Sequence, residues 1–308
     1  MIGSLLDIRL FVAAYEARSF TGAARRENAT QSGVSQHIRK LEDRFGISLF
    51  TRDKSRVAPT PAGDVYYRAC LEVLRAHDAA TQAVRACAGG LEGEVVVGLM
   101  PTMTRCVLAP ALARFVDAHP NAAIRVVEGY SATLTGLVQS GELDFAVVPG
   151  TAGISGVRSR LILRTPEVLV GARDRSVREP YAPVRPAELG RLRLVVPSRI
   201  NTRRHSIESY LASNGVAVDR MMEVDAMLGT LDLVGRSDWV AVLPGIMMAS
   251  EVEPATLIVN PLASPALIVD LVLIEPARKT LSPVAAAFLG LLEEEGERIN
   301  ARWSDALA

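Results

Sequence analysis

Five polar side chains between residues 31 and 39 have chemistry that suits contact with the edges of DNA bases. They are two amides, two hydroxyls and one guanidinium, in the order Gln31, Ser32, Ser35, Gln36 and Arg39. Such groups can donate and accept hydrogen bonds in a major groove. No carboxylate interrupts the set, since the next acidic residues are Glu42 and Asp43. The pattern therefore favours recognition of duplex DNA.

Three short helices are predicted to position these side chains. Their buried stripes comprise Ile8, Phe11, Val12 and Tyr15 in the first, Phe20, Ala23 and Ala24 in the second, and Val34, Ile38, Leu41 and Phe45 in the third. Ser19 and Thr30 are expected to cap the second and third helices, because a hydroxyl can accept from the free N–H groups there. The small alanines allow two helices to cross closely. The polar set then lies on the outer face of the third helix.

A basic β-hairpin is predicted after Gly46, which should end the third helix. Leu49 and Phe50 lead into this hairpin, whose tip is residues 53–56. The residues expected to contact DNA form two groups. The helices and their starts contribute Ser19, Thr30, Gln31, Ser32, Ser35, Gln36 and Arg39, and the hairpin contributes the phosphate contacts Arg52, Lys54 and Arg56. Any one of these side chains alone is explained by a solvated helix face. Together they predict a winged helix-turn-helix.

The segment resembles the N-terminal domain of LysR-type transcriptional regulators. The resemblance is carried by Phe11, Ser19-Phe20-Thr21, Ala23-Ala24, Gln31-Ser32, Val34-Ser35, Ile38, Leu41-Glu42, Gly46, Leu49-Phe50, Arg52 and Thr60-Pro61-Ala62-Gly63. Glu27 and Ala29 depart from the family pattern, because leucines commonly occur at both positions. A buried carboxylate needs a partner, so Glu27 is expected to pair with Arg25, Arg26 or Arg44, or to face solvent.

Composition and charge agree with this interpretation. Lysines and arginines equal aspartates and glutamates at 34 each, but residues 1–62 contain ten basic and six acidic residues. A basic end on an otherwise acidic chain suits tunable binding to DNA. Cys70, Cys87 and Cys106 form no CxxC pair, which favours a reducing cytoplasm and argues against structural zinc. No signal peptide and no apolar run of about 18 residues are evident, so neither export nor membrane insertion is expected.

A long helix is predicted from Pro61 to about Gly89, where the next breaker occurs. Its apolar stripe is formed by Tyr66, Cys70, Val73, His77, Ala80, Val84 and Cys87. This stripe can pair with a second copy of the helix, as in the family that the chain resembles. The alternative is a helix packed lengthwise on its own chain. Residues 1–60 are therefore assigned to the winged helix-turn-helix and 61–90 to a linker and dimerisation helix.

From Glu94 onward, short β-branched runs alternate with helical segments, which predicts an α/β fold with parallel sheet. Expected strands lie near residues 94–99, 122–128, 143–149, 167–172, 192–197, 239–244 and 268–275, with helices at 104–118, 132–139, 203–214 and from 283. The order resembles the two-lobed, periplasmic-binding-protein-like effector domain of the same regulators. Residues 91–308 are assigned to it, with one lobe at about 94–165 and 265–303 and the other at about 166–264.

Three loops at the carboxyl ends of the expected strands are candidates for a small-molecule site. Open parallel sheets bind ligands at this edge, where helix N-termini offer free N–H groups. The candidate effector-binding residues are Thr102, Met103, Thr104, Ser131, Pro149, Ser198, Asn201 and Thr202. Each hydroxyl alone is more simply an N-cap. Arg203 and Arg204 lie close by, which makes a carboxylate effector plausible.

The sequence offers no cluster for catalysis. The four histidines are scattered, and no P-loop, GxGxxG, HExxH or CxxC motif is present. Cys106 can be a redox sensor, although a core cysteine is the simpler interpretation. The competing hypotheses are an oligomeric DNA-binding regulator without an effector and an α/β solute-binding protein.

The resemblance implies a transcriptional regulator and not an enzyme. Its expected partners are double-stranded DNA, a small-molecule effector, RNA polymerase and further copies of the chain in a homotetramer built as a dimer of dimers. Neither a cofactor nor a membrane is expected among its partners, and the expected location is the cytoplasm.

Overall fold

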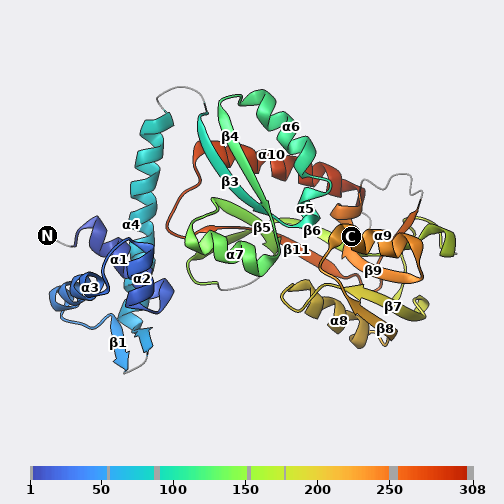
Figure 1. Ribbon diagram of the computed structural model, residues 1–308, viewed down its shortest axis with the longest axis horizontal. Helices are drawn as coiled ribbons and strands as arrows, with labels where there is room; N and C mark the ends of the chain where they lie inside the picture. Colours follow the sequence, from blue (N-terminus) through green and yellow to red (C-terminus); the bar gives the residue numbers. More distant parts are fainter. Residues whose placement is uncertain are drawn as a thin grey trace. The chain divides into compact units, whose positions relative to one another are not determined.

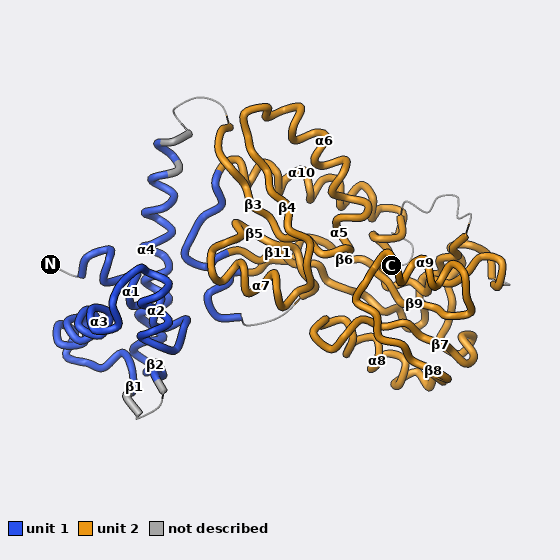
Figure 2. The backbone as a smooth tube through the Cα atoms, in the orientation of Figure 1, with its two compact units in different colours: residues 1–90, 154–158, 276–282 blue, residues 91–153, 159–275, 283–308 orange. Residues whose placement is uncertain are grey.

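The computed structural model describes residues 3–53, 56–86, 91–150, 154–176, 178–249 and 256–303, with the side chains of residues 52, 53, 56, 82, 85 and 86 left out. The chain divides into two compact units, which Figure 2 colours separately. Unit 1 comprises residues 1–90, 154–158 and 276–282, and unit 2 comprises 91–153, 159–275 and 283–308. The finer domain and lobe boundaries given above stay a prediction.

Unit 1 begins with three helices at the expected places (Figure 1). They are α1 (Leu5–Ala17), α2 (Phe20–Arg26) and α3 (Gln31–Phe45). Ser19 caps α2 by accepting from the amide of Gly22 at 3.1 Å, and Thr30 caps α3 by accepting from the amide of Gly33 at 3.1 Å. Gly46 ends α3 with a left-handed φ of 65°. The sequence therefore predicted both caps and this helix end.

The core of unit 1 is aromatic and aliphatic. Phe11 is fully buried, and its ring centroid lies 4.7 Å from that of Tyr66 and 5.4 Å from that of Phe50. Val34, Ile38 and Leu41 of α3 are buried as expected. The prediction that Phe45 is buried is wrong, since 43% of this residue is exposed. Phe45 lies in the last turn of α3, where its ring packs edge-on against that of Tyr66, with ring centroids 5.0 Å apart.

A two-stranded hairpin follows, with β1 (Phe50–Asp53) paired antiparallel to β2 (Arg56–Pro59). Its base is tied to α3 by Glu42, whose carboxylate accepts from the amides of Leu49 at 2.8 Å and Phe50 at 3.1 Å. Glu42, the first acidic residue after the polar set, therefore anchors the hairpin to α3.

The long helix α4 (Pro61–Ala86) starts at a close backbone contact. Thr60 accepts from the amide of Gly63 at 3.1 Å, and a Cβ at Gly63 would lie only 2.3 Å from the carbonyl oxygen of Leu49. Any larger residue would push the helix away from the hairpin. The steric need explains the glycine in the Thr60 to Gly63 motif.

The predicted stripe on α4 divides into two parts. Tyr66 and Cys70 pack into the core of unit 1, whereas Val73 and Val84 are 46% and 73% exposed. His77 and Ala80 are also exposed, and Cys87 lies outside the described residues. The alternative of packing along the chain's own fold is therefore correct for the first half of the helix.

Glu27 has partners other than the expected ones. Its side chain is only 3% exposed and binds Arg9 of α1 at 2.7 Å and Arg278 at 2.9 Å. Arg26 instead pairs with Glu16, at 2.5 Å. Arg278 belongs to the segment 276–282, which also places the amide of Thr280 2.9 Å from Asp78. Sequence periodicity carries no information about a partner 251 residues away.

Unit 2 is built on a mixed nine-stranded sheet in the order β4-β3-β5-β11-β6-β9-β7-β8, with β10 also paired to β6. The strands are β3 (Gly93–Leu99), β4 (Ala122–Glu128), β5 (Phe145–Pro149), β6 (Val157–Ala172), β7 (Arg191–Val196), β8 (Ala217–Glu223), β9 (Trp239–Pro244), β10 (Leu257–Pro261) and β11 (Ile268–Pro276). Strands β3, β4 and β5 are parallel, as are β7, β8 and β9, whereas β11 and β6 run antiparallel to neighbours. The parallel expectation is thus confirmed for these two groups of strands.

The helices of unit 2 are α5 (Pro101–Thr104), α6 (Leu108–Ala118), α7 (Ser131–Ser140), α8 (Arg203–Ser213), α9 (Met227–Arg236) and α10 (Pro283–Asn300). Short 3-10 turns η1 (Arg173–Arg175), η2 (Pro186–Glu188), η3 (Gly245–Met248) and η4 (Ala301–Trp303) complete it. The sequence pattern did not predict β8, α9, β10 or the first half of β6. The polar start of β6 is largely exposed, so it has no continuous apolar run to reveal it. Among the described residues, no helix is long and apolar enough to cross a membrane.

Candidate functional site

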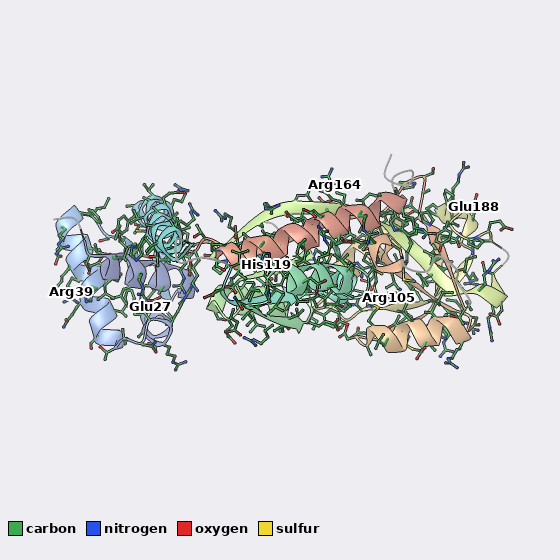
Figure 3. All side chains as sticks on the ribbon, turned by 90° about the horizontal axis from the view of Figure 1, so that it is seen from above. Glu27, Arg39, Arg105, His119, Arg164 and Glu188 are labelled. Atoms are coloured by element: carbon green, nitrogen blue, oxygen red, sulfur yellow. The ribbon has the colours of Figure 1, made fainter. Side chains whose placement is uncertain are left out.

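The polar set of α3 lies on the outside of unit 1. Gln31, Ser32, Gln36 and Arg39 are exposed, and Ser35 is half-buried. Figure 3 labels Arg39, which points away from the body of unit 1. Thr30, at the start of α3, is exposed as well. The helix therefore presents one face of hydrogen-bonding groups free of carboxylates.

An acid beneath that face is held inside the fold. Asp7 of α1 is buried and lies 2.5 Å from Nδ1 of His37 on α3, and it also accepts from the amide of Ser4 at 2.7 Å. Burial alone would raise the pKa of Asp7, but the hydrogen bonds from His37 and Ser4 outweigh it and hold the pKa below the usual 3.8. The pair also ties α3 to α1.

The wing is described only by its backbone. Arg52 and Arg56 lie on β1 and β2 in opposite halves of the hairpin, with Arg52 paired in register with Val57. Their side chains, and the whole of Lys54, lie outside the described residues. The predicted phosphate contacts stay a prediction.

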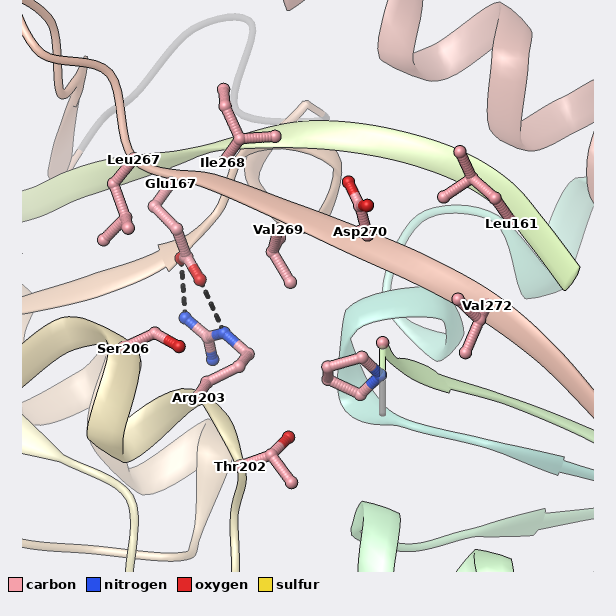
Figure 4. A pocket seen from close by; sticks show the side chains of 12 residues that line it. Leu161, Glu167, Thr202, Arg203, Ser206, Leu267, Ile268, Val269, Asp270 and Val272 are labelled. Carbon is pink, nitrogen blue, oxygen red and sulfur yellow. Dashed lines mark hydrogen bonds and ion pairs between the residues drawn. The ribbon is translucent and has the colours of Figure 1, made fainter. Parts of the chain in front are cut away.

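Unit 2 contains a cavity of about 480 Å³ beside the neighbouring strands β6 and β11 (Figure 4). It is lined by Pro149, Gly150, Leu161, Glu167, Thr202, Arg203, Ser206, Leu267, Ile268, Val269, Asp270 and Val272. These residues come from the end of β5, from β6, from the start of α8, and from β11 with the residue before it. The volume suits a small organic molecule.

A buried ion pair forms one wall of this cavity. Arg203 donates from Nε to Glu167 at 2.7 Å and from Nη2 to the second carboxylate oxygen at 2.6 Å. Nη2 also donates to the carbonyl of Val242 at 3.0 Å, and the side chains are 5% and 3% exposed. Removing one partner of such a pair costs about 3–5 kcal/mol, because it leaves a buried charge uncompensated. The pair is therefore a fixed feature of the wall.

The structure brings only two of the eight predicted effector residues to this cavity, Pro149 and Thr202. Asn201 is buried and accepts from the amide of Arg203 at 3.1 Å, so it shapes the start of α8. Thr102 and Met103 are buried in α5, and Thr104 donates to Glu128. The buried hydroxyls of Ser131 and Ser198 have no hydrogen-bond partner in the described part of the chain.

A second cavity, of about 460 Å³, lies at the carboxyl ends of β3, β4 and β8, where the sequence placed its loops. It is lined by Pro101, Glu128, Gly129, Tyr130, Thr133, Asp225, Ala226, Met227 and Leu228. The hydroxyl of Tyr130 donates to the carbonyl of Asp225 across it. Burial first, and then the charges of Asp225 and Glu128, raise the pKa of Tyr130.

Three polar residues of the cavity, Glu167, Ser206 and Asp270, were not predicted from the sequence. A usable signal existed for the two carboxylates, since each interrupts an otherwise apolar strand, in PEVLVGA and in IVDLVLIE. A charge in such a run needs a partner or a ligand. Ser206 carries no comparable signal.

The cysteines have different surroundings. Burial raises the pKa of the Cys70 thiol to about 11, so it stays protonated at neutral pH. Cys106 is half-buried, and its thiol donates to the carbonyl of Met247 at 3.1 Å. The described residues contain no cluster of three or more metal-ligating side chains.

The fold and these sites define a class of protein. A capped helix-turn-helix with a carboxylate-free polar face, joined to an α/β unit with an internal cavity, is the arrangement of a ligand-responsive DNA-binding regulator. Two family models match the chain, "Bacterial regulatory helix-turn-helix protein, lysR family" over residues 5–64 and "LysR substrate binding domain" over residues 88–297. The chain belongs to the LysR family of transcriptional regulators, and it is not an enzyme.

Two relatives are similar over different shares of the chain. The nitrogen assimilation regulatory protein nac of Escherichia coli (strain K12) is 27% identical over 286 residues, which cover 92% of each chain. A probable hydrogen peroxide-inducible genes activator of Mycobacterium xenopi is 34% identical over 154 residues, which cover 50% of this chain and 82% of the relative.

Solved structures share the fold. A Corynebacterium glutamicum OxyR C206 mutant matches with a TM-score of 0.60 at 20% identity, covering 98% of this chain and 94% of that one. Full-length CbnR in complex with its target DNA matches with a TM-score of 0.55 at 18% identity, covering 96% and 100%. The predicted combination of a helix-turn-helix with a two-lobed α/β domain is confirmed.

Proposed function

We propose that the exposed face of α3 reads the bases of an operator. The observation that carries this proposal is that Gln31, Ser32, Gln36 and Arg39 are exposed together with no acid among them. Ser35 lies at the edge of this face, and Ser19 and Thr30, the N-caps of α2 and α3, would contact phosphates. Arg52, Lys54 and Arg56 of the hairpin complete the phosphate contacts.

Two substitutions separate base reading from phosphate contact. Gln31→Ala is expected to change the preferred base at one operator position, whereas Arg52→Ala should weaken binding to all sequences alike and reduce the salt slope by about one. Binding to a randomised duplex library at two salt concentrations measures both effects. If both variants altered base preference equally, this assignment of roles would be wrong.

We propose that a small-molecule effector occupies the 480 Å³ cavity of unit 2. The support is its concave, mainly apolar wall with a few convergent polar groups, Thr202, Arg203 and Ser206 among them. A ligand that contacts both sides of the cavity favours one arrangement of the strands and helices around it. That preference would be passed to the operator-bound protein.

Thr202→Val tests the position of this effector site. It should reduce ligand-dependent expression from the regulated promoter in the native host and leave operator binding by the purified chain unchanged. Thr256→Val makes the same chemical change at an exposed residue outside the cavity and should have no effect. Equal induction by the Thr202 variant and the unaltered chain would favour a regulator without an effector in this cavity.

We further propose a homotetramer, built as a dimer of dimers through α4, that acts in the cytoplasm and contacts RNA polymerase. Relatives of the family include a protein solved with its target DNA. The exposed Val73 and Val84 on α4 support pairing between copies. Sedimentation of the purified chain with and without operator tests the assembly.

A further inference from the structure

We infer that the effector of this chain carries no net negative charge. The inference deepens the proposed function and rests on its placement of the effector in the 480 Å³ cavity. It concerns the charges already present in the cavity wall. The sequence suggests a carboxylate effector because Arg203 and Arg204 lie close to the candidate loops. Whether these arginines can attract such a ligand depends on the side chains with which they already pair.

Both arginines are neutralised within the chain. Arg204 binds Glu208 at 2.5 Å, Glu223 at 3.3 Å and the carbonyl of Pro197 at 2.7 Å. Arg203 makes the two-bond pair with Glu167, a carboxylate in the position that an anionic ligand would take on this guanidinium. An incoming carboxylate would meet the attraction of Arg203 and the repulsion of Glu167 at similar range, so it gains little.

The rest of the wall adds no further positive charge. Asp270 of β11 lines the cavity and pairs at 3.0 Å with Arg164, which lies outside the lining; the two side chains are 42% and 63% exposed. Glu167, Arg203 and Asp270 are the charged side chains of the lining, and together they carry one net negative charge. Figure 4 shows the carboxylate of Asp270 on the side of β11 away from Arg203 and Thr202.

The wall still offers specific hydrogen bonds. The side chains of Thr202, Arg203 and Ser206 line the cavity and carry hydrogen-bonding groups. Nη1 can donate to a neutral oxygen, the hydroxyls can donate or accept, and Asp270 can accept from an amino group. Leu161, Leu267 and Val272 supply apolar surface. The site therefore fits an uncharged or amine-bearing molecule with a short apolar body.

Three probes of matched shape test the charge preference. They are 3-methylbutanamide, 3-methylbutylamine and 3-methylbutanoate, titrated into the full chain and measured by calorimetry and thermal shift. The amide or the amine is expected to bind at least tenfold more tightly than the acid. Acid binding as tight as that of the other two would overturn the inference.

The variant Glu167→Gln provides the sharper test, since it frees the charge of Arg203 at constant side-chain size. It should raise the affinity for 3-methylbutanoate at least tenfold, whereas Glu297→Gln, at an exposed residue of α10, should not. Unchanged acid binding by a folded Glu167→Gln variant contradicts the inference. If this variant fails to fold, Asp270→Asn provides the test instead. It should weaken binding of the amine at least fivefold and leave binding of the amide unaffected. Equal effects on both ligands would overturn the inference.

Failure of the inference and failure of the proposed function give different results. Tight binding of the acid to the unaltered chain, abolished by Thr202→Val, overturns the charge inference and supports the cavity as a ligand site. Absence of binding by every probe to every variant overturns both, because a freed guanidinium in an open cavity must attract the acid.

Discussion

At the scale of single residues, the determining features are buried charges with distant partners. Asp7, Glu27 and Glu167 are each enclosed, and each pairs with a basic side chain from another helix: His37 of α3, Arg9 of α1 and Arg203 of α8, respectively. Such groups give specificity to the fold because a wrong arrangement leaves a charge unpaired. Their effects on stability can be measured one at a time.

Asp7 should make unit 1 sensitive to acid. Because its folded pKa is lowered, its contribution is fully present above the unfolded value of about 3.8 and is lost as the pH falls through the lower folded value. Asp7→Asn should therefore reduce stability at pH 7 by about 1 kcal/mol, by weakening the helix cap, and the difference from the unaltered chain should shrink below pH 4. Thermal unfolding between pH 3 and 7 measures this.

Asp43→Asn is the matched control, since Asp43 is an exposed carboxylate of α3. It should unfold like the unaltered chain at every pH. If Asp7→Asn lowered the unfolding temperature by the same amount at pH 3 and pH 7, the ionised carboxylate would not be the source of stability.

At the scale of elements, α4 shows how one helix serves two surfaces. Tyr67 and Cys70 face the core of unit 1, where the Tyr67 ring stacks on that of Tyr15 at 3.8 Å. Val73 and Val84, two members of the stripe predicted by the sequence, are exposed on one side of the helix. This second half of the predicted stripe is therefore the surface available to a second copy.

Val73→Asp should dissociate the proposed dimer, because a charge in an apolar helix pair loses its hydration without gaining a partner. Sedimentation equilibrium should show at least a tenfold weaker association. Ala79→Asp adds the same charge at an exposed residue outside the valine set and should leave association unchanged. A Val73→Asp protein that remains fully dimeric would rule out this face.

At the scale of the whole molecule, unit 1 includes chain from three separate regions. The segment 276–282 supplies Arg278 to Glu27 and the carbonyl of Ala277, which accepts from Arg75 at 3.0 Å. The DNA-binding unit is therefore not a self-contained N-terminal fragment. Its stability should depend on residues that follow the last strand of unit 2.

Arg278→Ala should destabilise unit 1 by about 1.5–3 kcal/mol, the value of a hydrogen bond to a charged group, with Arg9 remaining on Glu27. Hydrogen exchange of the amides of α1 and α2 in the full chain reports this locally. Lys279→Ala removes the same charge at the neighbouring exposed residue and should have little effect. Equal exchange in the two variants would mean that Arg278 does not support unit 1.

The sequence by itself determined the local features of this protein. Helices α1 to α3, the caps Ser19 and Thr30, the stop at Gly46 and the α/β alternation follow from interactions within a few residues, and side-chain periodicity records these directly. The polar face of α3 was predictable for the same reason. The resemblance to the LysR family rested on these residues.

Only the tertiary structure decided which distant residues meet. Glu27 bonds to Arg278, Glu167 to Arg203, and of the predicted effector residues Pro149 and Thr202 share the 480 Å³ cavity. None of the eight predicted effector residues lines the second cavity, and the prediction from strand ends missed the contributions of β6 and β11 to the first. Pairings between segments far apart in the chain depend on how the strands are ordered in the sheet, and periodicity along one segment cannot encode that order.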